Sequence, residues 1–183
     1  MAEFINTMDV IGDVALTSSI IDRSITEYKD NTITSIGNYA FALCTQLASV
    51  DCPNVTKIGN TALSSCSSLT SVSLPAATTI DGGGFSFCGQ LKIADLPSAA
   101  SIGNSAFANC GNLKAIILRN TSVCILGSGV FVNDSSVYIY VPAALVDTYK
   151  AATNWSDHAS KIRALEDYTV DGTVTGELDP TKI

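Results

Sequence analysis

The chain has 183 residues, a length that suits one ordinary domain. Hydrophobic residues make up 46 % of it and charged residues only 15 %, a composition that argues against intrinsic disorder. The formal net charge is −7, from 10 Lys+Arg against 17 Asp+Glu, so the chain offers no basic face for nucleic acid or for an anionic membrane surface.

The N-terminal segment has the pattern of a helical cap. Residues 8–23 place four aliphatic side chains on roughly one helical face: Val10, Val14, Ile20 and Ile21. The SITEY segment (24–28) follows as a first, imperfect strand, so we predict that residues 1–32 form a helical cap and a first strand. The opening letters lack a basic region and a compact apolar core, so we expect no signal peptide, and no apolar run approaches the roughly 20 residues of a transmembrane helix.

A period of 22 residues organises residues 33–142. The decapeptide SIGNYAFALC (35–44) returns three periods later as SIGNSAFANC (101–110), and five columns share this spacing. The columns are Ile36, Ile58, Ile80 and Ile102; Phe41, Leu63, Phe85 and Phe107; Cys44, Cys66, Cys88 and Cys110; Leu47, Leu69, Leu91 and Leu113; and Cys52, Leu74, Leu96 and Leu118. A degenerate fifth rung, stretched by one or two residues, follows. One such unit cannot bury its own apolar face, so we predict stacked rungs that share one interior.

Each rung is predicted to hold one short strand and one short helical turn. The stretch LTSVSLP alternates polar and apolar residues around Val72, and Pro75 ends the strand because proline donates no ladder hydrogen bond. The stretch IGNSAFANC places Ile102, Phe107 and Cys110 at near-helical spacing, which favours a helical turn on the opposite side.

These motifs resemble the BspA-type, or Treponema-type, leucine-rich repeats of bacterial surface proteins. The resemblance rests on SIGNYAFALCTQLASVDCP, KIGNTALSSCSSLTSVSLP, TIDGGGFSFCGQLKIADLP and SIGNSAFANCGNLKAIIL. It implies an α/β solenoid, a right-handed coil of about five 22-residue rungs with helical caps at both ends. The flanks are similar to those of proteins from gut bacteria and their phages, which implies a role at a cell surface or in a virion. The third rung departs with DGGG (81–84), where we expect a distorted turn.

The C-terminal segment is predicted to close the other end of the stack. Pro142 suits the first turn of a helix, and an apolar stripe follows in residues 143–166, which we predict to be a helical cap. A second short helix is expected around Trp155 and Ile162. Asp171-Gly172 predicts a tight hairpin within the tail of residues 167–183, and this tail is a candidate contact for a homo-oligomer.

No residue pattern points to catalysis, a metal or a cofactor. The cysteine column would set neighbouring Cα atoms roughly 5 Å apart, which permits a disulfide, but one inward column favours buried free thiols that act as small apolar groups. The single histidine, His158, is expected on a solvated helix surface. Without a second histidine or a Ser-His-Asp grouping, we predict no enzymatic activity.

The predicted binding surface is the concave face of the strands. Two columns point outward there: Ser49, Ser71, Ile93, Ala115 and Tyr138; and Asp51, Ser73, Asp95, Ile117 and Tyr140. The candidate binding residues are Ile93, Asp95, Ile117, Tyr138 and Tyr140, because a contiguous apolar and aromatic patch in solvent usually marks an interaction site. The alternative is that the C-terminal hairpin or a second subunit covers this patch.

The sequence therefore predicts a non-enzymatic module that binds a protein or a glycan, with surface adhesion as its role. The alternative is a structural or assembly component of a phage or prophage virion. We expect no nucleic-acid partner and no membrane insertion. The compartment stays open between the cell surface and a virion.

Overall fold

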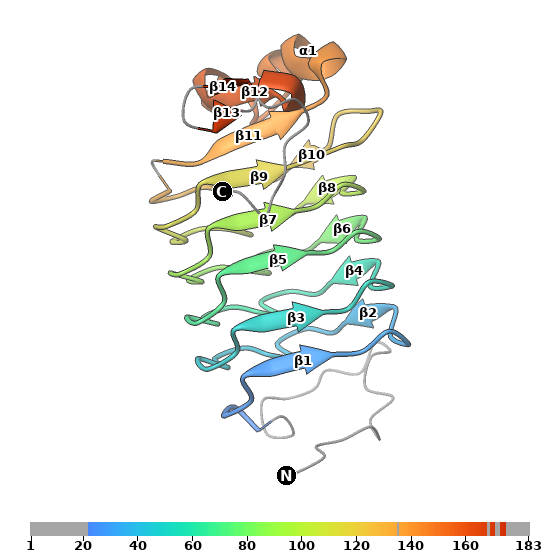
Figure 1. Ribbon diagram of the computed structural model, residues 1–183, viewed down its shortest axis with the longest axis vertical. Coiled ribbons are helices and arrows are strands. Elements are labelled where there is room, and N and C mark those ends of the chain that lie inside the picture. Colours follow the sequence, from blue (N-terminus) through green and yellow to red (C-terminus); the bar gives the residue numbers. More distant parts are fainter. Residues whose placement is uncertain (1–21, 135, 168, 171–172, 175–183) are drawn as a thin grey trace.

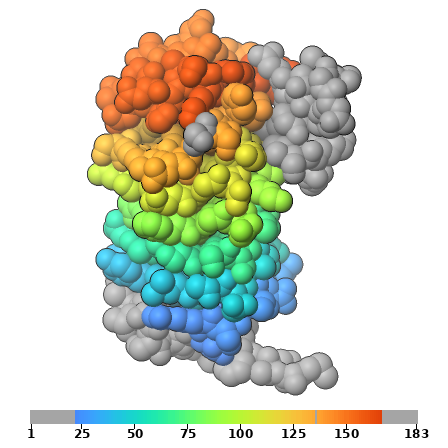
Figure 2. Space-filling view, turned by 90° about the vertical axis from the view of Figure 1, so that its left-hand side faces the viewer, coloured from blue at the N-terminus to red at the C-terminus, as the bar shows by residue number. Residues whose placement is uncertain are grey.

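The structure is a computed structural model that describes residues 22–134, 136–167, 169–170 and 173–174. The chain winds into a solenoid whose rungs lie side by side along the long axis of the molecule (Figure 1). In the space-filling view the colours follow one another in bands, so each rung contacts the rungs before and after it (Figure 2). The predicted N-terminal helix lies outside the described residues except for its last two positions.

One strand of each rung builds a parallel sheet with the predicted register. The strands are β1 (Glu27–Lys29), β3 (Ser49–Asp51), β5 (Ser71–Ser73), β7 (Ile93–Asp95), β9 (Ala115–Ile117), β11 (Tyr138–Val141) and β12 (Ile162–Ala164). β12, β11, β9, β7 and β5 form one sheet in that order, and β1 pairs with β3. Val72 lies opposite Ala94, and Ala94 lies opposite Ile116, each one period along the chain. The repeat period and the stacking are thereby confirmed.

A second parallel sheet, which the sequence did not predict, runs along the solenoid. Its strands have two residues each: β2 (Ser35–Ile36), β4 (Lys57–Ile58), β6 (Thr79–Ile80), β8 (Ser101–Ile102) and β10 (Ile125–Leu126). The second residue of β2, β4, β6 and β8 belongs to the isoleucine column, that of β10 is Leu126, and all five are buried. A polar residue followed by isoleucine is too short a pattern to distinguish a strand from the start of a turn.

The predicted helical turn of each rung is wrong. The described residues between β1 and Pro142 contain no helix. The chain instead alternates its hydrogen bonds: Phe85 N–H donates to Ala106 of the next rung at 2.8 Å, whereas Ser86 N–H donates to Gly83 of its own rung at 3.0 Å. A continuous helix would keep all of these donors within the rung and leave the next rung unbonded.

Two positions in this turn have left-handed backbone. The first holds Gly83 (φ 65°) and the second Phe87 (φ 60°). Three of the other rungs place a non-glycine residue at the first position with a similar angle, and the last rung has Gly129 there (φ 61°). The DGGG stretch is therefore not a distorted turn, since Gly83 N–H donates to Asn104 at 2.9 Å as Thr61 N–H does to Gly82. Glycine adopts this left-handed conformation without strain, whereas a residue with a side chain at the same position of another rung adopts it under strain.

The five inward columns are buried as predicted, and all six cysteines are free and buried. Each thiol from the second to the fourth rung donates to a main-chain carbonyl of the rung before it, as Cys88 Sγ does to Leu63 at 3.1 Å. Burial raises the pKa of Cys66 and of Cys110 to about 12. Cysteine is thus both a small apolar group and a weak donor in this column.

The C-terminal segment packs onto the last rung (residues 121–142). It contains the short helical elements η1 (Ala143–Leu145), α1 (Val146–Ala151), η2 (Ser156–Lys161) and η3 (Leu165–Asp167), together with β12. The indole N–H of Trp155 donates to Cys124 O at 2.7 Å, and Cys124 N–H donates to the Tyr149 hydroxyl at 2.9 Å. The expectation that Ile162 lies in a second helix is wrong, because it begins β12 and pairs with Ile139.

β13 (Thr169–Val170) and β14 (Thr173–Val174) pair in antiparallel fashion, as the Asp171-Gly172 pattern predicts. The two turn residues themselves lie outside the described part of the chain. Across the described residues, no helix has the length and apolar character needed to cross a membrane.

We predict that Phe87→Asn stabilises the protein. Phe87 is 57 % exposed and has left-handed backbone, and Asn109 and Asn133 occupy the equivalent position with φ of 62° and 65°. Because asparagine tolerates this conformation better, the free energy of unfolding should rise by about 0.5–1 kcal/mol, measured by urea denaturation. The exposed Gln90→Asn serves as a control without left-handed backbone, and a loss of stability in Phe87→Asn would contradict the argument.

Candidate functional site

The outward residues of β1, β3, β5, β7, β9, β11 and β12 form one surface, which we call the strand face. Its N-terminal half is polar and exposed: Glu27, Lys29, Ser49, Asp51, Ser71 and Ser73. Lys29 Nζ lies 2.7 Å from the Asp51 carboxylate, but both side chains are largely in solvent, so this ion pair contributes little stability. This half offers small polar groups and no apolar anchor.

The C-terminal half of the strand face holds a small apolar cluster that is separate from the main interior. Ile93, Ala115 and Ile117 are buried there together with Leu165, and Tyr140 packs against them. The expectation that Ile93 and Ile117 face solvent is therefore wrong, because they are only 7 % and 0 % exposed. Leu165 belongs to η3, so the segment before the predicted hairpin, and not the hairpin named in the alternative, contributes a residue to the cluster.

Tyr138 lies beside this cluster and stays 44 % exposed. The Arg163 guanidinium is 5.0 Å from the centroid of its ring. Arg163 Nη1 also donates to the carbonyls of Ser160 at 2.7 Å and Ile162 at 3.0 Å. The cation is thus held over the aromatic ring by main-chain acceptors, a favourable geometry for a cation–π contact.

Asp95 is paired with Arg119 on the same face. Their side chains are only 16 % and 26 % exposed, and Arg119 Nη1 donates to Asp95 Oδ1. Ladder pairing places Tyr140 between Ile117 and Arg163, so the ion pair, the tyrosines and Arg163 share adjoining strands. Sequence reasoning identified Asp95 and both tyrosines but missed the two arginines, because Arg163 lies on a strand that was taken for a helix and Arg119 follows the end of β9.

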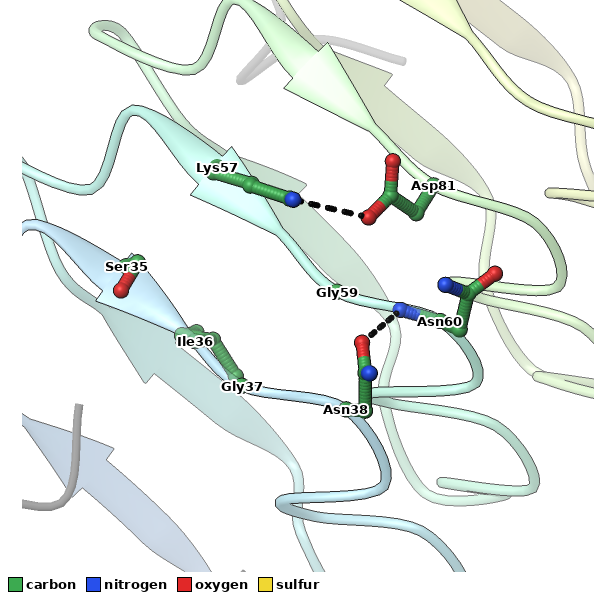
Figure 3. Close-up of a pocket in the computed structure, with 8 residues that line it drawn as sticks. All are labelled: Ser35, Ile36, Gly37, Asn38, Lys57, Gly59, Asn60 and Asp81. Carbon is green, nitrogen blue, oxygen red and sulfur yellow. Dashed lines mark hydrogen bonds and ion pairs between the residues drawn. The ribbon is translucent and has the colours of Figure 1, made fainter. Parts of the chain in front are cut away.

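A small hollow lies beside β2 and β4 (Figure 3). Its lining residues are Ser35, Ile36, Gly37, Asn38, Lys57, Gly59, Asn60 and Asp81. Asn38 Oδ1 accepts from Asn60 N–H at 2.8 Å, and Lys57 Nζ lies 3.3 Å from Asp81 Oδ2. A Cβ on Gly59 would come within 2.7 Å of the Asn38 main-chain nitrogen, so the missing side chain follows from the close stacking of rungs. We therefore assign this hollow to the architecture of the repeat.

His158 is not the solvated histidine that the sequence suggested. It is partly buried, and its ring meets Phe131 edge-on with the centroids 5.1 Å apart. Burial, followed by the charge of Lys161, lowers its pKa. Across the described residues no group of three or more His, Cys, Asp and Glu side chains is placed to hold a metal ion.

We predict that Leu165→Ala uncovers the apolar cluster. Removing a buried leucine side chain should lower the free energy of unfolding by about 2 kcal/mol, measured by urea denaturation. The fluorescence of an apolar dye should increase because Ile93 and Ile117 become accessible. The exposed Glu166→Ala is the matched control, and equal behaviour of the two variants would show that Leu165 does not cover the cluster.

Comparison with known proteins places the chain among repeat proteins. Residues 6–151 match the family model of the BspA type leucine rich repeat region, in six copies. The crystal structure of the T. pallidum leucine-rich repeat protein TpLRR is similar, with 28 % identity and a TM-score of 0.55 over 60 % of this chain and 52 % of that one. The chain therefore corresponds to about half the length of TpLRR.

Two further crystal structures have lower TM-scores. A leucine-rich repeat protein from Bacteroides ovatus has 24 % identity and a TM-score of 0.47, over 65 % of this chain and 40 % of that one. A leucine rich cell surface protein from Faecalibacterium prausnitzii has 18 % identity and a TM-score of 0.47, over 77 % and 47 %. No curated protein matches the sequence.

Proposed function

The chain belongs to the BspA-type leucine-rich-repeat family, and from that premise we propose that it is a non-enzymatic module that binds a protein or a glycan through its strand face. Leucine-rich-repeat proteins generally serve as binding modules, because a stack of rungs presents an extended regular surface. The role we propose for this module is adhesion at a cell surface. The alternative, a virion component, has no specific contact in its favour among the described residues.

The observation that carries the proposal is the half-exposed Tyr138 ring beneath Arg163. Tyrosine and arginine dominate the energetics of many interfaces, because each combines a large contact area with directed polar groups. Arg163 is already fixed by two carbonyls, so a partner that contacts it immobilises little additional side-chain freedom. This corner of the strand face is therefore preorganised for binding.

The five candidate residues have different roles in this proposal. Tyr138 and Asp95 contact the partner, Asp95 as one half of its ion pair with Arg119. Ile93 and Ile117 lie beneath and support Tyr140 from the buried cluster. The partner we propose presents hydrogen-bonding and apolar groups together, as a protein loop or a sugar ring does.

We predict that Tyr138→Ala weakens binding by at least about tenfold, or 1.4 kcal/mol. The protein is immobilised and tested by surface plasmon resonance against a panel of extracellular matrix proteins and purified glycans, and each binder is then measured with the variant. Ser49→Ala, on the polar half of the strand face, is the matched control and should bind as the unchanged protein does. If Tyr138→Ala kept the affinity of the unchanged protein for every binder, the strand face would be excluded as the binding site.

A further inference from the structure

Asp134 occupies the cysteine column in the last rung. Its backbone N–H donates to Phe131 O at 3.2 Å, just as Cys110 N–H donates to Phe107 O at 3.3 Å one rung earlier. The four preceding members of the column are buried thiols. The last rung therefore places a carboxyl group where the four rungs before it have a small apolar group.

The carboxyl group of Asp134 is buried and has no hydrogen-bond partner among the described residues. The residue is 2 % exposed, and neither Oδ1 nor Oδ2 has a partner. Every other buried polar or charged side chain among the described residues is a serine. An ionised carboxylate in such a place loses its hydration without compensation, so the neutral form is strongly favoured.

The surroundings of Asp134 account for its titration. Burial raises its pKa to about 7. The Cys110 main-chain amide, which donates to Phe107 O and not to the carboxyl group, and the Lys161 charge oppose this rise. Cys110 of the preceding rung and Lys161 of η2 are the titratable groups that interact electrostatically with it. His158, also in η2, packs on Phe131 instead.

Asp134 also lies at the boundary between the last rung and the C-terminal segment. Lys161 Nζ donates to its main-chain oxygen at 3.3 Å. Phe131 lies three positions before Asp134, and the centroid of its ring is 6.3 Å from that of Trp155. Trp155 is fully buried. A charge on Asp134 would therefore act on the packing between η2 and the last rung.

We propose that Asp134 is a proton-operated latch: the segment of residues 156–164 stays docked on the last rung while the carboxyl group is neutral, and ionisation of this group releases the segment. Residues 156–164 comprise η2 and β12. Release would separate β12 from β11 and carry Arg163 away from Tyr138. The consequence for binding rests on the function proposed above, whereas the latch itself does not.

The sign of the effect follows from the two protonation states. When the segment is released, Asp134 ionises near its ordinary pKa of 3.8, whereas with the segment docked it holds its proton up to about pH 7. Between these two pH values the equilibrium constant for opening should rise with pH by up to about tenfold per pH unit, and it should level off above pH 7. His158 acts in the opposite sense, because its lowered pKa makes protonation at low pH favour the open state.

The test is amide hydrogen exchange of residues 156–164 between pH 5 and pH 8, corrected for the intrinsic pH dependence of exchange. In the unchanged protein the opening equilibrium of these amides should increase with pH as described. Asp134→Cys, which restores the residue of the column, should show no such increase, and amides of β5 serve as an internal control. His158→Gln removes the opposing titration and should steepen the dependence.

Two further measurements keep the test decisive if Asp134→Cys folds poorly. Asp134→Asn removes the charge with little change in size, and the carboxyl carbon of Asp134 can be titrated by NMR in the unchanged protein. A titration midpoint near 3.8, or equal pH dependence in the unchanged protein and the Asp134 variants, would overturn the latch. Neither readout involves a binding partner, so failure of the latch and failure of the proposed function are distinguishable.

Discussion

Each rung lies flat against the next and is hydrogen-bonded to it, and the rest of this structure depends on that constraint. Two parallel sheets and the turn after the second sheet all donate or accept between neighbouring rungs. Equivalent side chains must therefore lie above one another, and each column of the sequence meets one environment from rung to rung. The same constraint brings the Asn38 main-chain nitrogen within 2.7 Å of where a Cβ on Gly59 would lie, and it explains why the cysteine thiols find a carbonyl one rung away.

The sequence was sufficient to predict which columns lie in the interior and how the long strands pair. The inward columns, the register of the long strands and the buried thiols follow from the period alone. The helical turn was wrong because Ile102, Phe107 and Cys110 have the same spacing in a helix and in a turn that bonds across rungs. The burial of Ile93 and Ile117 could not be predicted, because Leu165, with which they cluster, is separated from them by 72 and 48 residues. The role of Arg163 could not be predicted, because it lies on β12 in a segment for which the sequence predicts a helical cap.

The C-terminal segment joins the two proposals. It supplies Arg163 and Leu165 to the strand face, and it packs on the rung that contains Asp134. A binding site assembled from a repeat and from the segment that closes it is only as stable as the contact between them. The stack itself is uniform, so differences in local stability should concentrate at this contact, where a carboxyl group replaces the thiol of the column.

The central claim, that residues recurring every 22 positions share one interior, is tested most directly by thiol reactivity in the native protein. Cys44, Cys66, Cys88 and Cys110 are each at most 1 % exposed, and burial raises the pKa of every one of them. Treatment with a soluble disulfide reagent at pH 8, followed by mass spectrometry, should leave these four cysteines unmodified until denaturant is added. Modification of the column in the folded protein at the rate of exposed thiols would contradict the shared interior.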